Sequence, residues 1–272
     1  MRQKKVVFRE QEIVEFCKAT KDTNQIHDPE VMGGLGKHVI VPGMFALSFT
    51  MNLSADFLRT KANTISVFFN SLISSGDLVT LSALPDPECS DEIRLSAVHE
   101  KDTLTSKVDY SRIYHKPPDQ GSDHPWILRR SVVSEDQVKK FASLIEATDN
   151  DVAQFLFAIA YASNALLFSI RNPMTQVEAE IDQLINTDQG ISPFYHKLEI
   201  LFPEEFPVFT IKDSMDYFIH FEREKKNRLY VAHVRCENNG KIIFHAKINL
   251  MGIADQLIIR MAKQIRPQVN PV

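Results

Sequence analysis

The sequence has few of the residues that form covalent or metal-bound frameworks. Its 272 residues include three cysteines, Cys17, Cys89 and Cys236, and no CxxC pair. An odd number of widely separated cysteines argues against a disulfide framework and gives no zinc-binding spacing. The histidines after position 38 are also scattered singly, at positions 99, 115, 124, 196, 220, 233 and 245. We therefore expect neither a metal site nor structural disulfides, and a packing or surface role for these histidines.

Long hydrophobic runs and basic patches are missing as well. No segment reaches the ~18 uninterrupted apolar residues that a transmembrane helix needs. The basic N-terminus is followed by only three apolar residues, Val6, Val7 and Phe8, before charges return, so a signal peptide is not expected. The formal net charge of -4 and a pI near 6.1 give no electrostatic basis for binding nucleic acid. These absences predict a cytoplasmic globular protein with no membrane span and no nucleic-acid partner.

The first part of the chain has the pattern of a helix-and-sheet domain. Apolar residues at helical spacing predict an amphipathic helix over 10–20, and a second helix over 44–58 is apolar on nearly every side. Alternating apolar residues predict strands over 6–8, 64–73, 78–84, 92–99 and 104–115. Their short connections favour an antiparallel sheet wrapped around the apolar helix. Two prolines and a glycine among polar residues make 116–122 the clearest linker.

Beyond the linker the order of elements repeats. Residues 132–141 can be aligned with 7–16, and Ser134 with Gln137 predicts a capping box at the start of a helix. An apolar helix over 155–170 follows, then strands over 195–202, 208–221, 228–237 and 241–251, the last two joined by an Asn-Gly hairpin signal. We therefore predict an α+β protein of two related domains, residues 1–118 and 119–272. A tail over 254–265 has helical spacing and should pack on the second domain.

One stretch of the first domain concentrates the groups that activate water. Asp22, Asn24 and His27 lie within six residues, and after a loop Pro42 and Gly43 start the apolar helix. The alternatives are a structural histidine and side-chain caps at a helix end. Glycines 33, 34 and 36 lack the spacing of a phosphate loop, so they indicate an irregular, flexible segment. The corresponding segment of the second domain, 147–154, has no histidine and no glycine, which is typical of a copy without the active loop.

The motif Asp-x-Asn-x-Ile-His, followed by Val-Pro-Gly-Met, a buried helix, a strand, a Ser-Gly-Asp turn and another strand, resembles the MaoC-like hydratases. This family contains R-specific enoyl-CoA hydratases and 3-hydroxyacyl thioester dehydratases. The resemblance covers residues 6–115 well and the rest by the order of elements alone. It implies a double hot-dog, in which two antiparallel sheets each wrap a long buried helix and form an intramolecular pseudo-dimer.

The resemblance also implies site residues and chemistry. Asp22 and His27 would form the catalytic pair that activates water, and Asn24 would orient the loop or the water. The backbone N–H of Gly43 would bind the thioester oxygen, with Pro42 and Met44 beside the substrate. The implied substrate is an acyl thioester of coenzyme A or acyl carrier protein, and neither a metal nor a redox cofactor is needed. The chain would be a monomer or a homodimer whose C-terminal half walls the acyl tunnel.

Two positions differ from the family pattern, in which proline usually stands at Gln25 and histidine at Pro42. The loop over 28–41 is also shorter than is common. An altered substrate or a loss of activity would each be consistent with these differences. The alternatives are a hot-dog acyl thioesterase, or a catalytically silent protein that binds an acyl group or pairs with an active hydratase. The helix that begins near Phe155 would either shape the acyl tunnel or belong to the core.

Overall fold

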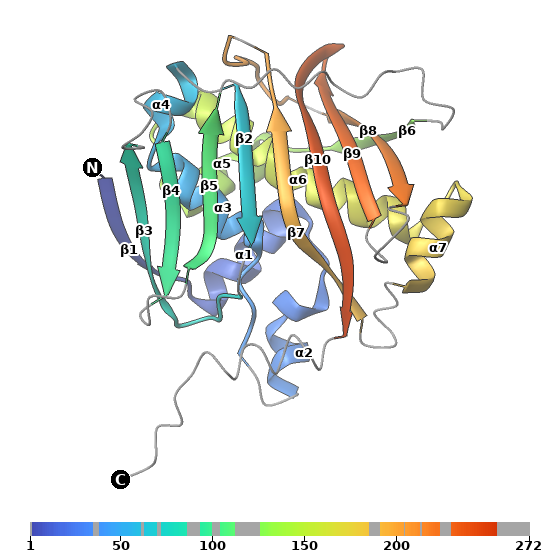
Figure 1. Ribbon diagram of the computed structural model, residues 1–272, viewed down its shortest axis with the longest axis horizontal. Helices are drawn as coiled ribbons and strands as arrows, with labels where there is room; N and C mark the ends of the chain where they lie inside the picture. The colour runs from blue at the N-terminus through green and yellow to red at the C-terminus, as the bar shows by residue number, and fades with distance from the viewer. Residues whose placement is uncertain are drawn as a thin grey trace.

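The computed structural model describes residues 2–34, 38–60, 63–69, 72–85, 93–99, 104–111, 126–184, 191–203, 205–212, 214–223 and 230–254. The expected linker over 116–122, the domain boundary at residue 118 and the expected tail helix after residue 254 lie outside these residues. Within them the chain forms one antiparallel sheet of ten strands whose one face is covered by helices (Figure 1). The predicted α+β class is confirmed.

Each half of the chain contributes five strands and its own helices. The N-terminal half contains β1 (Arg2–Val7), α1 (Glu10–Thr20), the 3-10 helix η1 (Gln25–His27), α2 (Pro29–Gly34), α3 (Gly43–Asn52), α4 (Ala55–Thr60), β2 (Thr64–Phe69), β3 (Leu78–Pro85), β4 (Ile93–His99) and β5 (Leu104–Ser111). The C-terminal half contains β6 (Ile127–Val132), α5 (Glu135–Leu144), α6 (Asn150–Arg171), α7 (Gln176–Leu184), β7 (Ile191–Leu201), β8 (Ser214–Arg223), β9 (Tyr230–Asn238) and β10 (Lys241–Ala254).

The order of the strands shows that the two halves are related by a pseudo-two-fold axis. The sheet runs β1-β3-β4-β5-β2-β7-β10-β9-β8-β6, so corresponding strands lie at equal distances from the centre. Strands β2 and β7 pair there in antiparallel register, with Val67 opposite Leu198. The two expected sheets are therefore continuous through this central pair. Asn239 and Gly240 have positive φ between β9 and β10, which agrees with the predicted hairpin.

The alignment of residues 132–141 with 7–16 holds in three dimensions. The backbone N–H of Arg9 donates to Glu12, and the equivalent N–H of Ser134 donates to Gln137, each at 2.9 Å. The equivalent side chains Phe16 and Phe141 contact each other, with ring centroids 5.8 Å apart. Equivalent residues that touch mark the position of a two-fold axis, so the axis passes between α1 and α5.

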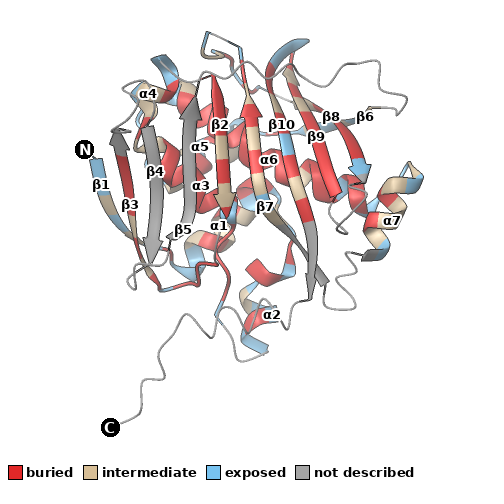
Figure 2. Ribbon diagram, in the orientation of Figure 1, coloured by how far each residue is buried: buried red, intermediate tan, exposed pale blue. Residues whose placement is uncertain are grey.

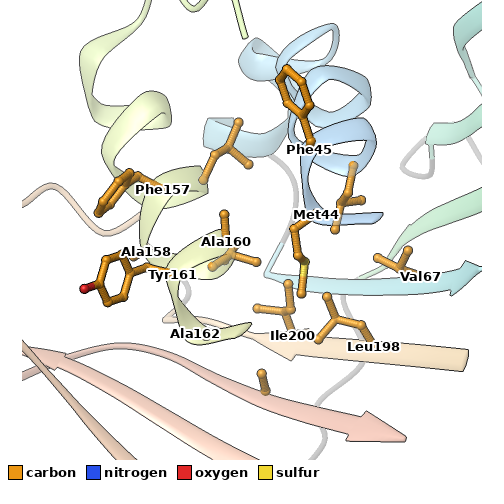
Figure 3. Packing of buried hydrophobic residues seen from close by; sticks show 14 of the residues in the cluster. Met44, Phe45, Val67, Phe157, Ala158, Ala160, Tyr161, Ala162, Leu198 and Ile200 are labelled. Atoms are coloured by element: carbon orange, nitrogen blue, oxygen red, sulfur yellow. The ribbon is translucent and has the colours of Figure 1, made fainter. Parts of the chain in front are cut away.

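The two central helices, α3 and α6, are buried between the sheet and the other helices (Figure 2). Among the described residues, α6 is the one helix that is long and apolar enough to cross a membrane, and 89% of its most apolar window is buried inside the molecule. Phe155, near its start, packs edge-to-face on Phe202 and Phe244, so this side chain belongs to the core. At the centre, Met44 of α3 and residues of α6 lie against strands β2 and β7 (Figure 3).

The boundaries of several helices differ from expectation for local reasons. The helix expected over 44–58 is interrupted after Asn52, where Ser54 hydrogen-bonds the carbonyl of Met51 instead of continuing the helix. The helix expected over 155–170 begins earlier because Asp149 accepts from the backbone N–H groups of Asp151 and Val152. Helices α2 and α7 were not expected at all. The loop after Asp28 is thus helical over Pro29–Gly34, not irregular throughout.

A partly buried histidine on the sheet makes stability depend on pH. Burial, together with the charge of Arg235, lowers the pKa of His245 to about 4, against about 6.5 in an unfolded chain. Between these values the unfolded chain binds more protons than the folded one, so the free energy of unfolding should decrease as the pH falls from 6.5 towards 4. Urea unfolding at pH 7.5 and pH 5 should show a smaller loss for His245→Gln than for the unmodified protein. Equal losses would contradict this prediction.

Candidate active site

The turn after α1 determines where Asp22 points. Lys21 ends the helix in the left-handed conformation with φ 54°, and the next backbone N–H, that of Asp22, donates to Cys17 O at 2.9 Å. One carboxylate oxygen of Asp22 then accepts from the backbone N–H of Asn24 at 3.0 Å. The Asn24 side chain in turn caps η1 by accepting from Ile26 N. Residues 22–27, which we call the hexad, therefore fold as a helix end followed by a capped 3-10 turn. This fold brings Asp22 and His27 to the same side.

A hydrogen bond to the backbone fixes the tautomer of the neutral His27 ring. Its Nδ1 lies 2.6 Å from the carbonyl oxygen of Ile40, and because a carbonyl only accepts, Nδ1 must carry the hydrogen. In the neutral ring Nε2 is then a proton acceptor, and it faces Asp22 Oδ2 at 4.0 Å. Both side chains are about 10% exposed. This separation is too long for a direct hydrogen bond, but it allows both groups to contact one water molecule.

The start of α3 forms the wall opposite this pair. Backbone bonds from Ile40 N to Ile26 O and from Val41 N to Ile73 O fix the segment before the helix. Gly43 is exposed, although Pro42 and Met44 on either side are buried. N–H groups in a first helical turn have no partner within the helix and favour negative charge. The backbone of Gly43 is therefore accessible and suited to bind an oxygen atom.

Packing also favours a glycine at position 43. A Cβ atom placed on Gly43 would lie 3.0 Å and 3.3 Å from two ring carbons of Phe69. That is closer than ordinary van der Waals contact, so a side chain here would push against the ring. Pro42 precedes the helix, and its carbonyl accepts from Phe45 N and Ala46 N. Its missing N–H removes no donor that the helix needs.

Two cavities meet at the hexad. A large groove of about 1010 Å³ lies outside it, and a small cavity of about 80 Å³ lies inside. Asp22, Asn24 and His27 line both spaces. The inner cavity is otherwise lined mainly by apolar groups and by the start of α3: Ile26, Ile40, Val41, Pro42, Gly43, Met44, Ala46, Phe69, Leu72, Ile73, Ser163, Leu167 and Tyr195. All six residues that we predicted for the site are thus brought together around the inner cavity.

The C-terminal half holds the loop that carries the hexad. Asn164 of α6 donates to the carbonyl of Lys21, and Arg171 at the end of α6 donates to Thr23 Oγ1 at 2.7 Å. Lys21 Nζ donates to Val132 O on β6 at 3.0 Å. The loop is therefore fixed on both sides of Asp22 by the other half of the molecule. Sequence patterns gave no indication of this, because none of these contacts is local.

Two further polar residues of the inner cavity, Ser163 and Tyr195, were also missed. Their hydroxyl oxygens lie 2.6 Å apart. Two hydroxyls that share one hydrogen bond leave one O–H hydrogen over, so the pair is a donor whichever way the bond runs. Burial raises the pKa of Tyr195, and the charge of Asp22 adds to this, so the phenol stays protonated. A lone serine on an apolar helix and a lone tyrosine on a strand carry no motif.

The second half lacks the corresponding groups where the chain is described. Glu146, the residue equivalent to Lys21 in the alignment, has the same left-handed φ of 54°. The residue after it is Ala147 instead of an aspartate, and the chain enters α6 almost at once, with Asp149 as the helix cap. This agrees with the interpretation of the second half as a copy without the active loop.

Other reactive groups do not form a second centre in the described part of the chain. Burial raises the pKa of Cys17, helped by the charges of Asp22 and Asp28, so its thiol is not activated as a nucleophile. His220 and His233 lie near Glu222 on the sheet, at 3.5 Å and 3.4 Å, which fits a strand-packing role. No cluster of three or more metal-binding side chains occurs among the described residues. His115 and His124 lie outside them.

Comparisons with known proteins agree on the fold. No family model and no curated protein matches the sequence. Among solved structures, a protein of Chloroflexus aurantiacus assigned as a MaoC domain dehydratase aligns over 92% of this chain and 95% of its own, with a TM-score of 0.58 and 9% identity. A Mycobacterium tuberculosis protein with a double hot-dog fold aligns over 92% and 94%, with a TM-score of 0.53 and 10% identity.

The fold is shared by proteins of more than one assigned activity. A Lactobacillus plantarum protein assigned as an oleoyl thioesterase aligns over 92% of this chain and 96% of its own, with a TM-score of 0.51 and 6% identity. Because identities of this size establish architecture alone, the chemistry has to be argued from the site. The predicted fold is nevertheless confirmed: the chain has the double hot-dog fold that MaoC-like dehydratases also have.

Proposed function

We propose that this protein is a hydro-lyase that adds water to 2-enoyl thioesters or, in the reverse direction, dehydrates 3-hydroxyacyl thioesters. The observation that carries the proposal is the arrangement of His27. Its Nδ1 hydrogen is committed to Ile40 O, so its basic Nε2 faces Asp22 at 4.0 Å beside the accessible backbone of Gly43. This reaction needs groups that take a proton from water, and it needs a hydrogen-bond donor for the developing oxyanion.

The proposed reaction uses the Asp22 and His27 pair for proton transfer and the Gly43 N–H for charge stabilisation. A water molecule held between Asp22 and His27 attacks C3, and one of them takes its proton. The electron pair of the C2–C3 double bond moves towards C1, so negative charge develops on the thioester oxygen. The Gly43 N–H, at the positive end of α3, would stabilise that charge. The group that received the proton then returns it to C2, and dehydration follows the same steps in reverse.

The two cavities accommodate the two ends of such a substrate. The outer groove has the volume of a site for a sizeable ligand, and Lys18, Arg129 and Arg130 lie along it with exposed apolar side chains. It would hold the pantetheine arm of coenzyme A or of an acyl carrier protein, and the acyl group would enter the inner cavity. In this scheme the carrier arrives as part of the substrate, and the protein supplies acid, base and donors.

The two departures from the family pattern are compatible with activity. Gln25 is exposed within η1 and lines only the outer groove, so it does not separate Asp22 from His27. Pro42 is buried in the inner wall, and its carbonyl begins the hydrogen bonds of α3. Neither residue disturbs the catalytic geometry, which favours an enzyme over a silent acyl-binding protein.

The decisive experiment follows the conjugated enoyl-thioester absorbance of crotonyl-CoA after addition of the purified protein, with a thiol reagent in a parallel sample. Loss of absorbance without release of thiol is the expected result. Release of free coenzyme A would identify a thioesterase instead. Absence of both reactions with coenzyme A and with carrier-protein substrates, in a folded sample, would reject the proposed function.

The Ser163 and Tyr195 pair should contribute to this activity. We expect Tyr195→Phe to lower kcat/KM about 5-fold. The change removes a hydroxyl that faces the same cavity as Asp22 and His27, and a typical neutral hydrogen bond contributes about 1 kcal/mol. Steady-state kinetics on crotonyl-CoA would measure the change. Tyr217→Phe is the matched control, since Tyr217 donates to Ala158 O at 2.9 Å in the core. An equal loss of activity in both variants would mean that Tyr195 is only structural.

A further inference from the structure

We infer that the acyl group of the substrate is short, with its chain ending within a few carbons of the reacting double bond. This inference deepens the proposed function and rests on it. Its starting point is the size of the inner cavity, about 80 Å³. Pockets that enclose a whole drug-sized ligand have about 300–1,000 Å³, so a cavity of this size can enclose only a small group. A butenoyl or hexenoyl group fits these limits, whereas a twelve-carbon chain exceeds them.

The direction in which the substrate binds follows from the difference between the two cavities. Asp22 and His27 lie where the spaces meet, so the two ends of a thioester bound there must extend one into each. The carrier arm, with pantetheine and phosphate groups, is far larger than the inner cavity. Only the outer groove of about 1010 Å³ can take it, which leaves the inner cavity for the acyl end.

The walls of the inner cavity are too well packed to yield a longer channel without displacement of the core. Met44, Phe69 and Leu167 are 3%, 8% and 4% exposed. Met44 points towards Leu198 and Ile200 of the central strand β7, both fully enclosed (Figure 3). The space between α3, α6 and the sheet is thus filled by side chains. Close-packed interiors of this kind resist the insertion of further methylene groups.

Phe69 and Leu167 come from different halves and determine the size of the cavity together. The Phe69 ring lies against Gly43, the residue whose backbone N–H would bind the thioester oxygen. Leu167 reaches the cavity from α6, four residues beyond Ser163 and therefore on the same helical face. Leu167 has an apolar side chain and is not one of the proposed catalytic groups, so it can be shortened without removing any of them.

The test compares kcat/KM for enoyl-CoA substrates of four, six, eight and twelve carbons. The unmodified protein should prefer four or six carbons to twelve by at least about 100-fold, since one misplaced methylene in an apolar pocket already costs about 10-fold or more. Leu167→Ala should increase kcat/KM for eight carbons relative to four by about 10-fold. Leu166→Ala, at a fully buried position outside the cavity, should leave the ratio unchanged.

A binding measurement separates this inference from the proposed function. Calorimetric titration with the unreactive butanoyl-CoA and dodecanoyl-CoA should show tighter binding of the shorter thioester, even if no hydration occurs. If no substrate were turned over, the proposed hydratase function would be rejected, but the inference on chain length would still be supported by the binding data. Equal or tighter binding of dodecanoyl-CoA, binding of neither thioester, or a twelve-carbon substrate turned over as fast as crotonyl-CoA would overturn it.

Discussion

Replacement of Asp22 by asparagine should lower kcat for hydration of crotonyl-CoA by about 10²- to 10⁴-fold, the range that general acid–base groups contribute. Asparagine keeps the shape of the side chain and one oxygen that can accept from Asn24 N, the bond that the carboxylate makes at 3.0 Å. The turn should therefore survive. What is lost is the basic oxygen that faces His27 Nε2, so the water is no longer activated. Steady-state rates and a circular dichroism spectrum would be measured together.

Asp28 offers a matched control six residues away. It caps the next turn in the same manner, accepting from Glu30 N at 2.8 Å, and it lines the outer groove without reaching the inner cavity. Asp28→Asn should retain nearly full kcat at saturating crotonyl-CoA. If Asp22→Asn stayed active, or if both variants lost activity equally, Asp22 would have no specific part in activating the water.

A double variant tests whether Asp22 and His27 act on the same water molecule. If they do, Asp22→Asn combined with His27→Ala should be little slower than the slower single variant, because the second change removes a group that no longer has a role. Losses that multiply would indicate two independent contributions. This outcome would contradict the shared-water arrangement inferred from the 4.0 Å separation.

Replacement of Glu178 by leucine should lower the free energy of unfolding by about 3–5 kcal/mol, as for other broken buried ion pairs. Glu178 is fully buried at the start of α7 and accepts from Ser169 Oγ, from Met174 N at 2.6 Å and from Thr175 N at 3.1 Å. Arg129 lies 3.9 Å away. Leucine would leave the Ser169 hydroxyl and the backbone N–H groups of Met174 and Thr175 without this acceptor. Urea unfolding followed by tryptophan fluorescence or circular dichroism would measure the change.

Two further variants define the cause of that loss. Glu178→Gln retains one acceptor oxygen and should fall between leucine and the unmodified protein. Glu135→Leu changes an exposed glutamate in the first turn of α5, which pairs with the exposed Lys139 four residues on, and should leave stability almost unchanged. If Glu178→Leu were as stable as the unmodified protein, the buried network would be unimportant for folding.

The sequence was sufficient to predict features that depend on local or repeated patterns. The helix over 10–20 has a regular apolar face and was predicted with the bounds that α1 has. The duplication was visible because equivalent caps and equivalent phenylalanines recur at one spacing. Asp22, Asn24 and His27 could be found together because all three lie within one turn and the helix end that precedes it.

Features that depend on distant contacts could not be predicted in this way. Glu178 is an ordinary glutamate in the sequence, and only the fold brings Arg129 and Ser169 to it. Ser163, Leu167 and Tyr195 reach the inner cavity from the other half of the molecule. The break after Asn52 likewise has no glycine or proline to mark it. In each case the observed structure depends on tertiary packing, which local sequence propensity does not specify.

The covalent joining of two hot-dogs frees the walls of this cavity from symmetry. In a dimer of identical chains, any substitution appears twice, so a change that reshapes a wall also alters the equivalent position beside the second set of catalytic groups. Here α3 and the hexad lie in one half, and Leu167 and Tyr195 lie in the other. Under the proposed function, substitutions in α6 would therefore retune which acyl groups are accepted while Asp22 and His27 stay unchanged. Selectivity and chemistry could then be altered independently of each other.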